Sequence, residues 1–139
     1  MDNDVAYFSS IRDPRMKCLT CLRTVYEPKK LFAVYRFQYQ GQNGEPGTDV
    51  DYCVNLTTTK SVRFGFSPCE DGDISSTGQG YFFDGKSCYV GRYPLLGNEP
   101  CLLWVKKDFK DSVSEECVAQ FDNNCGPQRY TLYDKDQCS

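Results

Sequence analysis

The cysteine content constrains this chain most: it has nine cysteines among 139 residues, far above ordinary usage. Disulfides form and persist in oxidising compartments and are rare in the cytosol. An odd count leaves one cysteine over, either as a buried free thiol or for intermolecular pairing. The sequence therefore predicts a secreted, disulfide-stapled protein whose signal peptide has been removed. On that route Asn55, in the sequon Asn55-Leu56-Thr57, is a candidate for glycosylation.

Size, composition and charge exclude several classes of protein. The length suits one domain, 1–139, and the 40% apolar and 25% charged residues are near globular averages. No apolar run approaches the ~18 residues that span a bilayer. The net charge is −3, and no basic run exceeds two residues. These charges argue against nucleic acid and against an anionic membrane surface, which both reward a clustered positive face. We expect a soluble monomer.

The segments between closely spaced turn signals are rich in Tyr, Phe, Val and Thr, which is typical of strands. The clearest strand is 31–40, whose alternate residues form one apolar face: Leu31, Ala33, Tyr35, Phe37 and Tyr39. The other expected strands are Val5–Ile11, Cys18–Tyr26, Val50–Leu56, Ser61–Ser67, Gln79–Asp84, Ser87–Tyr93, Cys101–Lys107 and Arg129–Tyr133. So many strands form a curled sheet, and closing it into an antiparallel barrel removes the unpaired edges.

One segment near the C-terminus reads as a helix. Ser112 followed by Glu115 has the spacing of a capping box, and Gly126-Pro127 provides a stop. Cys117, Phe121 and Cys125 recur at four-residue intervals, which places them on one apolar stripe. We expect this helix to pack against the barrel and to be tied to it by disulfides.

Several motifs together carry a family resemblance. The last forty residues combine Leu102-Leu103-Trp104 in a strand, an acidic turn, Cys117 with Phe121, and then Tyr133 and Cys138. Upstream, the pattern continues more loosely through Tyr7-Phe8, Asp13-Pro14, Cys18 and residues 86–90. This arrangement resembles the tick salivary lipocalins, the family of the histamine-binding proteins, some of whose members inhibit complement. The resemblance implies an all-β fold: an eight-stranded antiparallel lipocalin-like barrel, one C-terminal α-helix packed on its outside, and a short last strand.

The resemblance also implies two disulfides, Cys88–Cys117 and Cys18–Cys138, with Cys21 as a rival of Cys18. Among the remaining cysteines, Cys53 and Cys69 flank a predicted hairpin. Cys101 and Cys125 bracket the segment from the tryptophan strand to the helix. We therefore also predict Cys53–Cys69 and Cys101–Cys125.

The sequence offers little for catalysis. It contains no histidine, which removes the Ser-His and Cys-His nucleophile arrangements. Cys18-Leu19-Thr20-Cys21 has redox or zinc spacing, but no second such pair exists, and in one strand the two cysteines would face opposite ways. We expect no enzyme activity, metal or cofactor.

A barrel of eight strands has room for one small ligand. The candidate lining residues, which would equally serve as simple filling, are Tyr35, Phe37, Tyr39, Phe64, Phe82 and Trp104, with Phe66 and Tyr89. Amine-binding members of the family carry Glu-Leu-Trp where this chain has Leu102-Leu103-Trp104. Their tryptophan after the Asp-Pro turn is replaced by Arg15-Met16-Lys17. Only Asp13 is left as a counter-ion, so the resemblance disfavours histamine or serotonin as the ligand.

Two functions follow from the resemblance. The first is a secreted salivary lipocalin that suppresses host defence by binding an immune protein, most of all a complement component such as properdin or another alternative-pathway protein. Its contact surface would be the Gly- and Pro-punctuated loops 41–47, 68–78 and 94–100. The alternative is a scavenger of a small host mediator in the barrel: a lipid mediator or sterol, with an amine less favoured.

Overall fold

The computed structural model describes residues 3–41, 44–56 and 62–138, and within them the chain forms nine strands and one α-helix. The strands are β1 (Asn3–Ser9), β2 (Thr20–Glu27), β3 (Phe32–Tyr39), β4 (Thr48–Leu56), β5 (Arg63–Pro68), β6 (Thr77–Phe83), β7 (Cys88–Arg92), β8 (Cys101–Lys106) and β9 (Tyr130–Thr131). Each lies where a strand was expected, with ends that shift by up to two residues. Ser61, the expected start of the fifth strand, lies outside the described residues.

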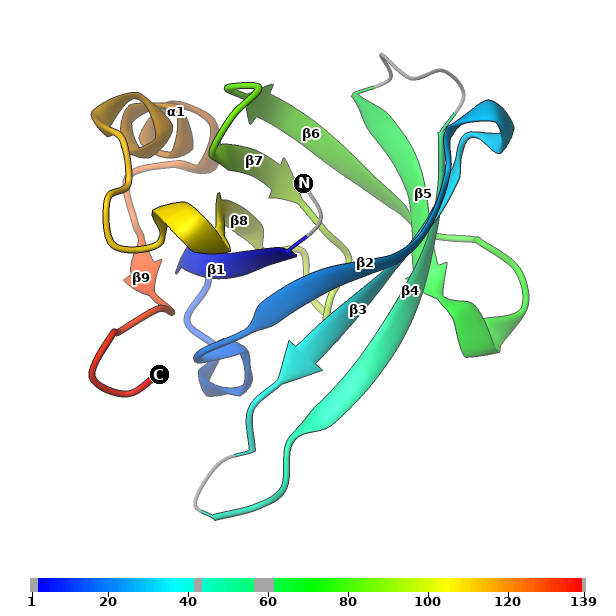
Figure 1. Cartoon of the computed structure of the whole chain (residues 1–139), viewed down its shortest axis with the longest axis horizontal. Coiled ribbons are helices and arrows are strands. Elements are labelled where there is room, and N and C mark those ends of the chain that lie inside the picture. The colour runs from blue at the N-terminus through cyan, green and yellow to red at the C-terminus, as the bar shows by residue number, and fades with distance from the viewer. Residues whose placement is uncertain (1–2, 42–43, 57–61, 139) are drawn as a thin grey trace.

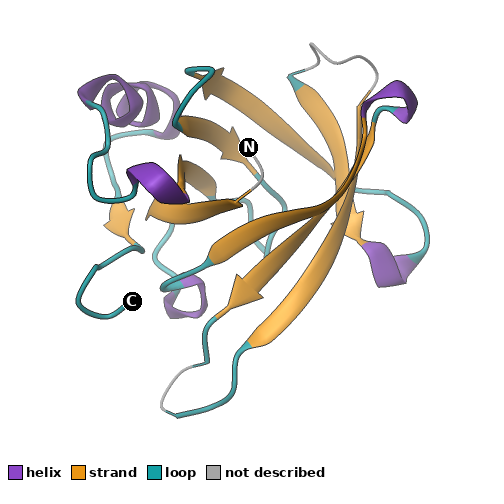
Figure 2. Ribbon diagram, in the orientation of Figure 1, coloured by secondary structure: helices purple, strands orange, loops and turns teal. Residues whose placement is uncertain are grey.

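Eight antiparallel strands close into a barrel in the order β2-β3-β4-β5-β6-β7-β8-β1, with β1 pairing again to β2 (Figure 1). The ninth strand adds to β1 at Phe8 and Ser9. Short 3₁₀ helices occupy several of the connections (Figure 2). The predicted barrel with an extra last strand is confirmed.

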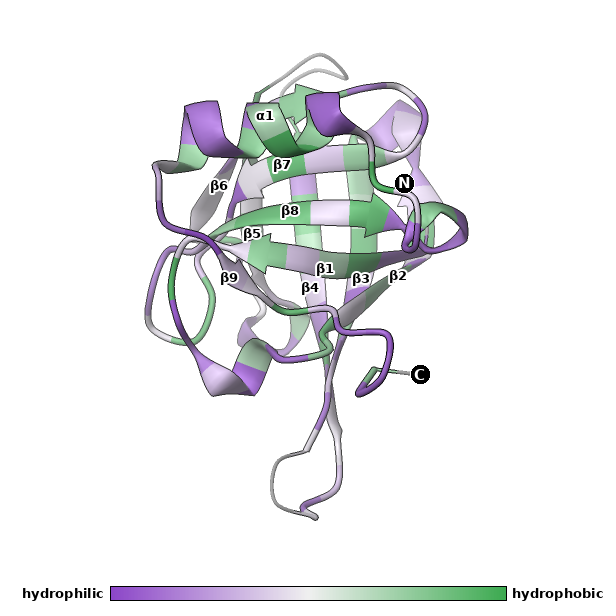
Figure 3. Ribbon diagram, turned by 90° about the vertical axis from the view of Figure 1, so that its left-hand side faces the viewer, coloured by the Kyte–Doolittle hydropathy of each residue, from purple (hydrophilic) through white to green (hydrophobic). Residues whose placement is uncertain are grey.

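Alternation of side chains along the strands fills the barrel interior. In β3, Ala33, Phe37 and Tyr39 are buried, as the predicted face requires. In β8 all five residues from Cys101 to Val105 are buried, because the inner face meets the barrel core and the outer face is covered. The cover is helix α1 (Glu115–Cys125), which lies across β7 and β8 (Figure 3).

The helix begins two residues later than the sequence suggested. Its N-cap is Ser114, whose Oγ accepts a hydrogen bond from the N–H of Cys117 at 3.1 Å. Ser112 instead belongs to the preceding turn, where its N–H donates to the carbonyl of Phe109, so the expected Ser112-Glu115 capping box is wrong. At the other end Gly126, with φ of 91°, stops the helix as predicted, because this left-handed region favours glycine.

Four disulfides staple the fold: Cys18–Cys138, Cys53–Cys69, Cys88–Cys117 and Cys101–Cys125. The last two tie α1 to β7 and β8. These are the four pairs expected above, and the cysteine left over is Cys21, which is buried. Both cysteines of the Cys-x-x-Cys motif were expected in one strand, but Cys18 precedes β2 and only Cys21 lies in it.

Candidate ligand-binding cavity

The two ends of the barrel differ in how they are filled. The β2–β3 and β6–β7 connections lie at one end of the barrel, at the top of Figure 1, which we call the open end. The opposite end, the closed end, carries the β1–β2, β3–β4, β5–β6 and β7–β8 connections.

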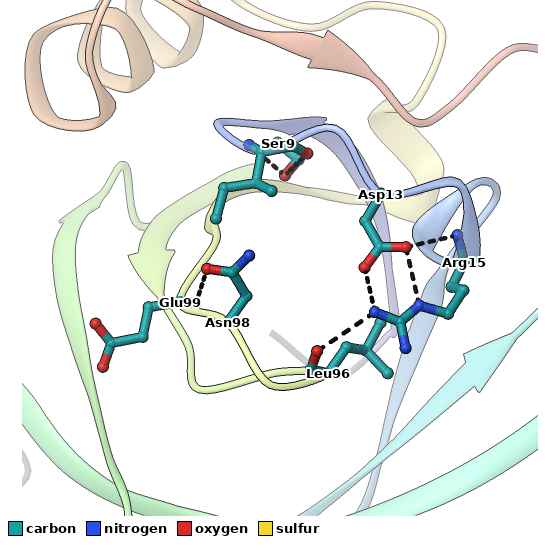
Figure 4. Close-up of polar contacts among 7 residues, drawn as sticks. Ser9, Asp13, Arg15, Leu96, Asn98 and Glu99 are labelled. Carbon is teal, nitrogen blue, oxygen red and sulfur yellow. Dashed lines mark hydrogen bonds and ion pairs between the residues drawn. The ribbon is translucent and has the colours of Figure 1, made fainter.

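Two connections are latched together at the closed end. Asp13 accepts a hydrogen bond from the guanidinium of Arg15 at 2.7 Å, and the same Nη2 donates to the carbonyl of Leu96 at 3.3 Å (Figure 4). The hydrogen bonds from Arg15 outweigh the effect of partial burial and lower the pKa of Asp13. Behind this latch Met16 and Leu95 are 1% exposed. The sequence left Asp13 as the only candidate counter-ion for an amine. Its carboxylate is hydrogen-bonded to Arg15 instead, and it does not line the cavity described below.

Leu102 lies within the same packed end. It is fully buried in a cluster with Met16, Leu19 and Leu95. Nearby, the hydroxyls of Tyr39 and Tyr52 are 3.0 Å apart, and burial raises the pKa of both. The position that holds Glu in amine-binding relatives is thus a leucine in a filled apolar core, where an ionised ligand could not be accommodated without large cost.

The open half of the barrel contains a cavity of about 280 Å³. Its walls are mostly aromatic, with Phe37 and Trp104 at 5.2 Å between ring centroids and Phe66 and Tyr93 at 5.4 Å. Around its mouth stand Tyr26 and Phe83, which are 57% and 51% exposed. The remaining lining residues are Asp4, Cys21, Pro28, Leu31, Phe32, Ala33, Tyr35, Val54, Leu56, Phe64 and Tyr89.

One carboxylate lies in this aromatic cavity. Asp4 is 5% exposed and pairs across β1 and β2 with Cys21. Burial, and then the charge of Asp4, raise the pKa of the Cys21 thiol well above its usual value. An ionised carboxylate among aromatic rings is suited to a cation, which gains from both the carboxylate and the ring faces.

Sequence reasoning missed Asp4 because the first strand was expected to begin at Val5. A signal was present: Asp4 and Ala6 are two residues apart, so in a strand they share a face, and Ala6 is fully buried in the barrel core. Extending the strand by one residue would have placed this carboxylate inside the barrel.

The residues proposed to line the barrel fall into three places. Tyr35, Phe37, Phe64 and Trp104 line the cavity, as do Phe66 and Tyr89. Tyr39 lies in the filled closed end with Tyr52. Phe82 packs instead with the second apolar cluster, between the barrel wall and α1, because a bulge between Gly80 and Phe82 shifts its register.

The loops proposed as a protein-binding surface gather at the closed end. They are 41–47, of which 42–43 lie outside the described residues, 68–78 and 94–100. Their charged residues are all acidic and all exposed: Glu45, Glu70, Asp71, Asp73 and Glu99.

One grouping in the described part of the chain has metal-ligand spacing, Asp84 with Cys88 and Cys117. The two cysteines form a disulfide, which leaves no thiolate for a metal. Asp84 serves the β6–β7 turn, where it accepts hydrogen bonds from the N–H groups of Lys86, Ser87 and Cys88. This cluster is structural.

Comparison with known proteins agrees with the geometry. A sequence profile of the tick histamine-binding protein family matches residues 9–139. The chain belongs to this family. No helix among the described residues is long and apolar enough to cross a membrane. A search of curated protein sequences finds no match.

Solved structures share the fold of this family member. Japanin from Rhipicephalus appendiculatus, bound to cholesterol, superposes with a TM-score of 0.72 at 12% identity, covering 97% of this chain and 94% of japanin. AM182 in complex with serotonin also gives a TM-score of 0.72, at 16% identity, covering 96% of this chain and 83% of AM182. Both confirm the fold of the barrel.

Proposed function

We propose that this protein sequesters a small aromatic amine in the cavity at the open end of its barrel. The observation that carries the proposal is the carboxylate of Asp4, 5% exposed within an aromatic cavity of about 280 Å³. This reverses the preference drawn from the sequence, which considered positions 13 and 102 and the replacement of the family tryptophan by residues 15–17.

Charge and size together select the ligand class. Burying an ammonium group requires a counter-charge, for which Asp4 is the candidate, and Trp104 and Tyr35 line the same cavity with aromatic rings. The same carboxylate repels an anionic lipid mediator. The volume lies just below the ~300–1,000 Å³ of pockets for drug-sized ligands, which suits a one- or two-ring amine better than a sterol.

Titration calorimetry with matched ligands tests this proposal. Serotonin is compared with 5-hydroxyindole, which lacks the ammonium group, and with 5-hydroxyindole-3-acetic acid, which carries a carboxylate in its place. We expect one serotonin per chain, because the closed end is filled, and at least ~30-fold weaker binding of both analogues, as loss of one partner of a buried charge pair implies. Equal affinity for the three compounds, or no binding of any small amine, would refute it.

A second candidate function, binding of a host immune protein, is favoured by three acidic loops of the closed end. Glu70, Asp71 and Asp73 lie on one exposed turn, and Glu45 and Glu99 lie on two other connections of the same end. Five carboxylates without a lysine or arginine in these loops fit a basic protein surface, such as that of a complement component. Haemolysis assays of the complement pathways test it, with Glu70→Gln, Asp71→Asn and Asp73→Asn combined in one variant. If the unaltered protein does not inhibit haemolysis, this candidate function is refuted.

We also propose that the protein is secreted in saliva and carries a glycan at Asn55. Four disulfides support secretion. Asn55 is exposed on β4, although Thr57 of its sequon lies outside the described residues. A mass decrease on treatment with an N-glycosidase, absent in Asn55→Gln, is the expected result.

A further inference from the structure

We infer that the open end of the barrel docks on bilayers that contain anionic phospholipid, with apolar side chains entering the interface and basic side chains meeting the headgroups. This inference does not rest on the identity of the cavity ligand. It concerns the surface around the cavity mouth, for which no partner has been described above.

The apolar part of this surface is concentrated at one end of the molecule. Within the described ranges, the large hydrophobic side chains that remain exposed are Leu22, Val25, Tyr26, Val62 and Phe83. Three of them are more than half exposed. Val62 (59% exposed) directly precedes β5, Tyr26 (57%) is the second-to-last residue of β2, and Phe83 (51%) is the last residue of β6. We call these three residues the rim. Three bulky apolar groups at one end of a water-soluble molecule mark a surface that contacts something else.

Basic residues accompany the rim. Lys29 and Lys30 form the exposed tip of the β2–β3 connection, at the top of Figure 1. Arg63 and Lys86 are exposed beside Val62 and Phe83 in the chain. Two acidic residues offset part of this charge: Glu27 lies 3.5 Å from Lys30, and Asp84 lies in the same turn as Lys86.

The distribution of charge orients the molecule. Three connections of the closed end, β3–β4, β5–β6 and β7–β8, present five exposed carboxylates and no basic residue, although the β1–β2 connection at that end adds Arg12, Arg15 and Lys17. The open end presents exposed lysine and arginine. An anionic surface therefore attracts the open end and repels the three acidic loops of the closed end. The net charge of −3 had argued against such a surface, but it averages over the acidic loops of one end and the basic residues beside the rim at the other.

The mixture of side chains favours a bilayer over other anionic partners. A sulfated polysaccharide would need the basic residues and not the rim. Tyrosine and phenylalanine beside lysine are the residues that settle at a membrane interface, with the ring in the apolar boundary and the charge among headgroups. The guanidinium of Arg23 lies 3.9 Å from the ring centroid of Tyr26 and helps to hold that ring in place.

Docking in this orientation has a functional consequence. Tyr26 and Phe83 line the cavity as well as belonging to the rim. The cavity mouth would therefore face the lipid surface, where amphipathic small molecules are enriched.

Co-sedimentation with vesicles tests the inference, using phosphatidylcholine alone and phosphatidylcholine with 30% phosphatidylserine at low and physiological salt. The variant Lys29→Gln/Lys30→Gln removes the hairpin charges, and Val62→Ser/Phe83→Ser removes part of the rim. The matched control Arg12→Gln/Lys135→Gln makes the same change in net charge at exposed sites in the β1–β2 loop and the C-terminal tail. Thermal unfolding checks that every variant folds.

We expect binding only to vesicles with phosphatidylserine, weakened by salt. Each basic residue at such a surface contributes about fivefold, so the lysine variant should bind about 25-fold more weakly and the control about as well as the unaltered protein. Loss of binding in the rim variant is also required. The inference is overturned if the vesicles are not bound, if the control loses as much as the lysine variant, or if the rim variant binds fully. It is also overturned if size-exclusion chromatography shows a dimer that the rim variant dissociates.

Discussion

Restoring the missing family carboxylate by Leu102→Glu should destabilise the protein without creating a second amine site. Leu102 is fully buried among Met16, Leu19 and Leu95, so the new carboxyl would enter a dry apolar core. Burial of this kind raises the pKa of a glutamic acid by about 3–5 units.

The size and pH dependence of the loss follow from that shift. A folded-state pKa above the unfolded value of ~4.3 means that the folded protein holds the proton more tightly, so the penalty is absent below pH ~4 and grows as the pH rises. At pH 7 it amounts to about 1.36 kcal/mol for each of roughly 2.7 pH units, or about 4 kcal/mol.

Urea unfolding with the disulfides intact, from pH 3.5 to pH 8, measures this loss. The control Leu102→Gln has nearly the same shape and does not titrate, so its stability relative to the unaltered protein should not vary with pH. A Leu102→Glu protein as stable at pH 8 as at pH 4, or one that binds a second amine, would show that the closed end is hydrated and that our reading of it is wrong.

Loop length should rank the disulfides: replacing both Cys18 and Cys138 with alanine opens a loop of 120 residues and should cost about 5 kcal/mol, against about 3 kcal/mol for the 16-residue loop between Cys53 and Cys69. Equal losses in urea unfolding would contradict this entropic account. Although burial acts in the opposite direction, hydrogen bonds from Ser87 and from backbone N–H groups hold the pKa of Asp84 well below its usual value. That contribution is present above pH ~4 and lost on acidification, so Asp84→Asn should flatten the acid limb of the stability curve; an unchanged limb would refute it. Cys21, buried and with a raised pKa, should react slowly with Ellman's reagent, and more slowly when the cavity is occupied. Rapid labelling that ligand does not slow would place the ligand elsewhere.

Much of the fold could be predicted because it depends on local patterns. The alternation from Leu31 to Tyr39, together with the turn residues around it, was enough to locate that strand. The number of short strands indicated a closed barrel, and the motif from Leu102 to Cys138 supplied the family. The helix start was misplaced because two serines stand near it, and only the hydrogen bond from the N–H of Cys117 distinguishes Ser114 from Ser112.

The candidate site was harder to predict because it depends on which end of the barrel is filled. The pattern of inward-facing residues cannot tell Tyr39, packed against Tyr52, from Tyr35, which borders the cavity. Asp13 and Leu102 were judged by their places in a motif. The carboxylate that matters in our account, Asp4, belongs to no motif and is identified only by the strand that turns it inward.

The most direct measurement of the central claim is the affinity for serotonin of the unaltered protein and of Asp4→Asn, by titration calorimetry at pH 7. The substitution keeps the shape of the side chain and removes its charge. We predict a loss of at least ~30-fold in affinity, with thermal stability retained or raised because a buried charge is gone. Affinity unchanged in Asp4→Asn would contradict the claim that this carboxylate makes the cavity a site for cations.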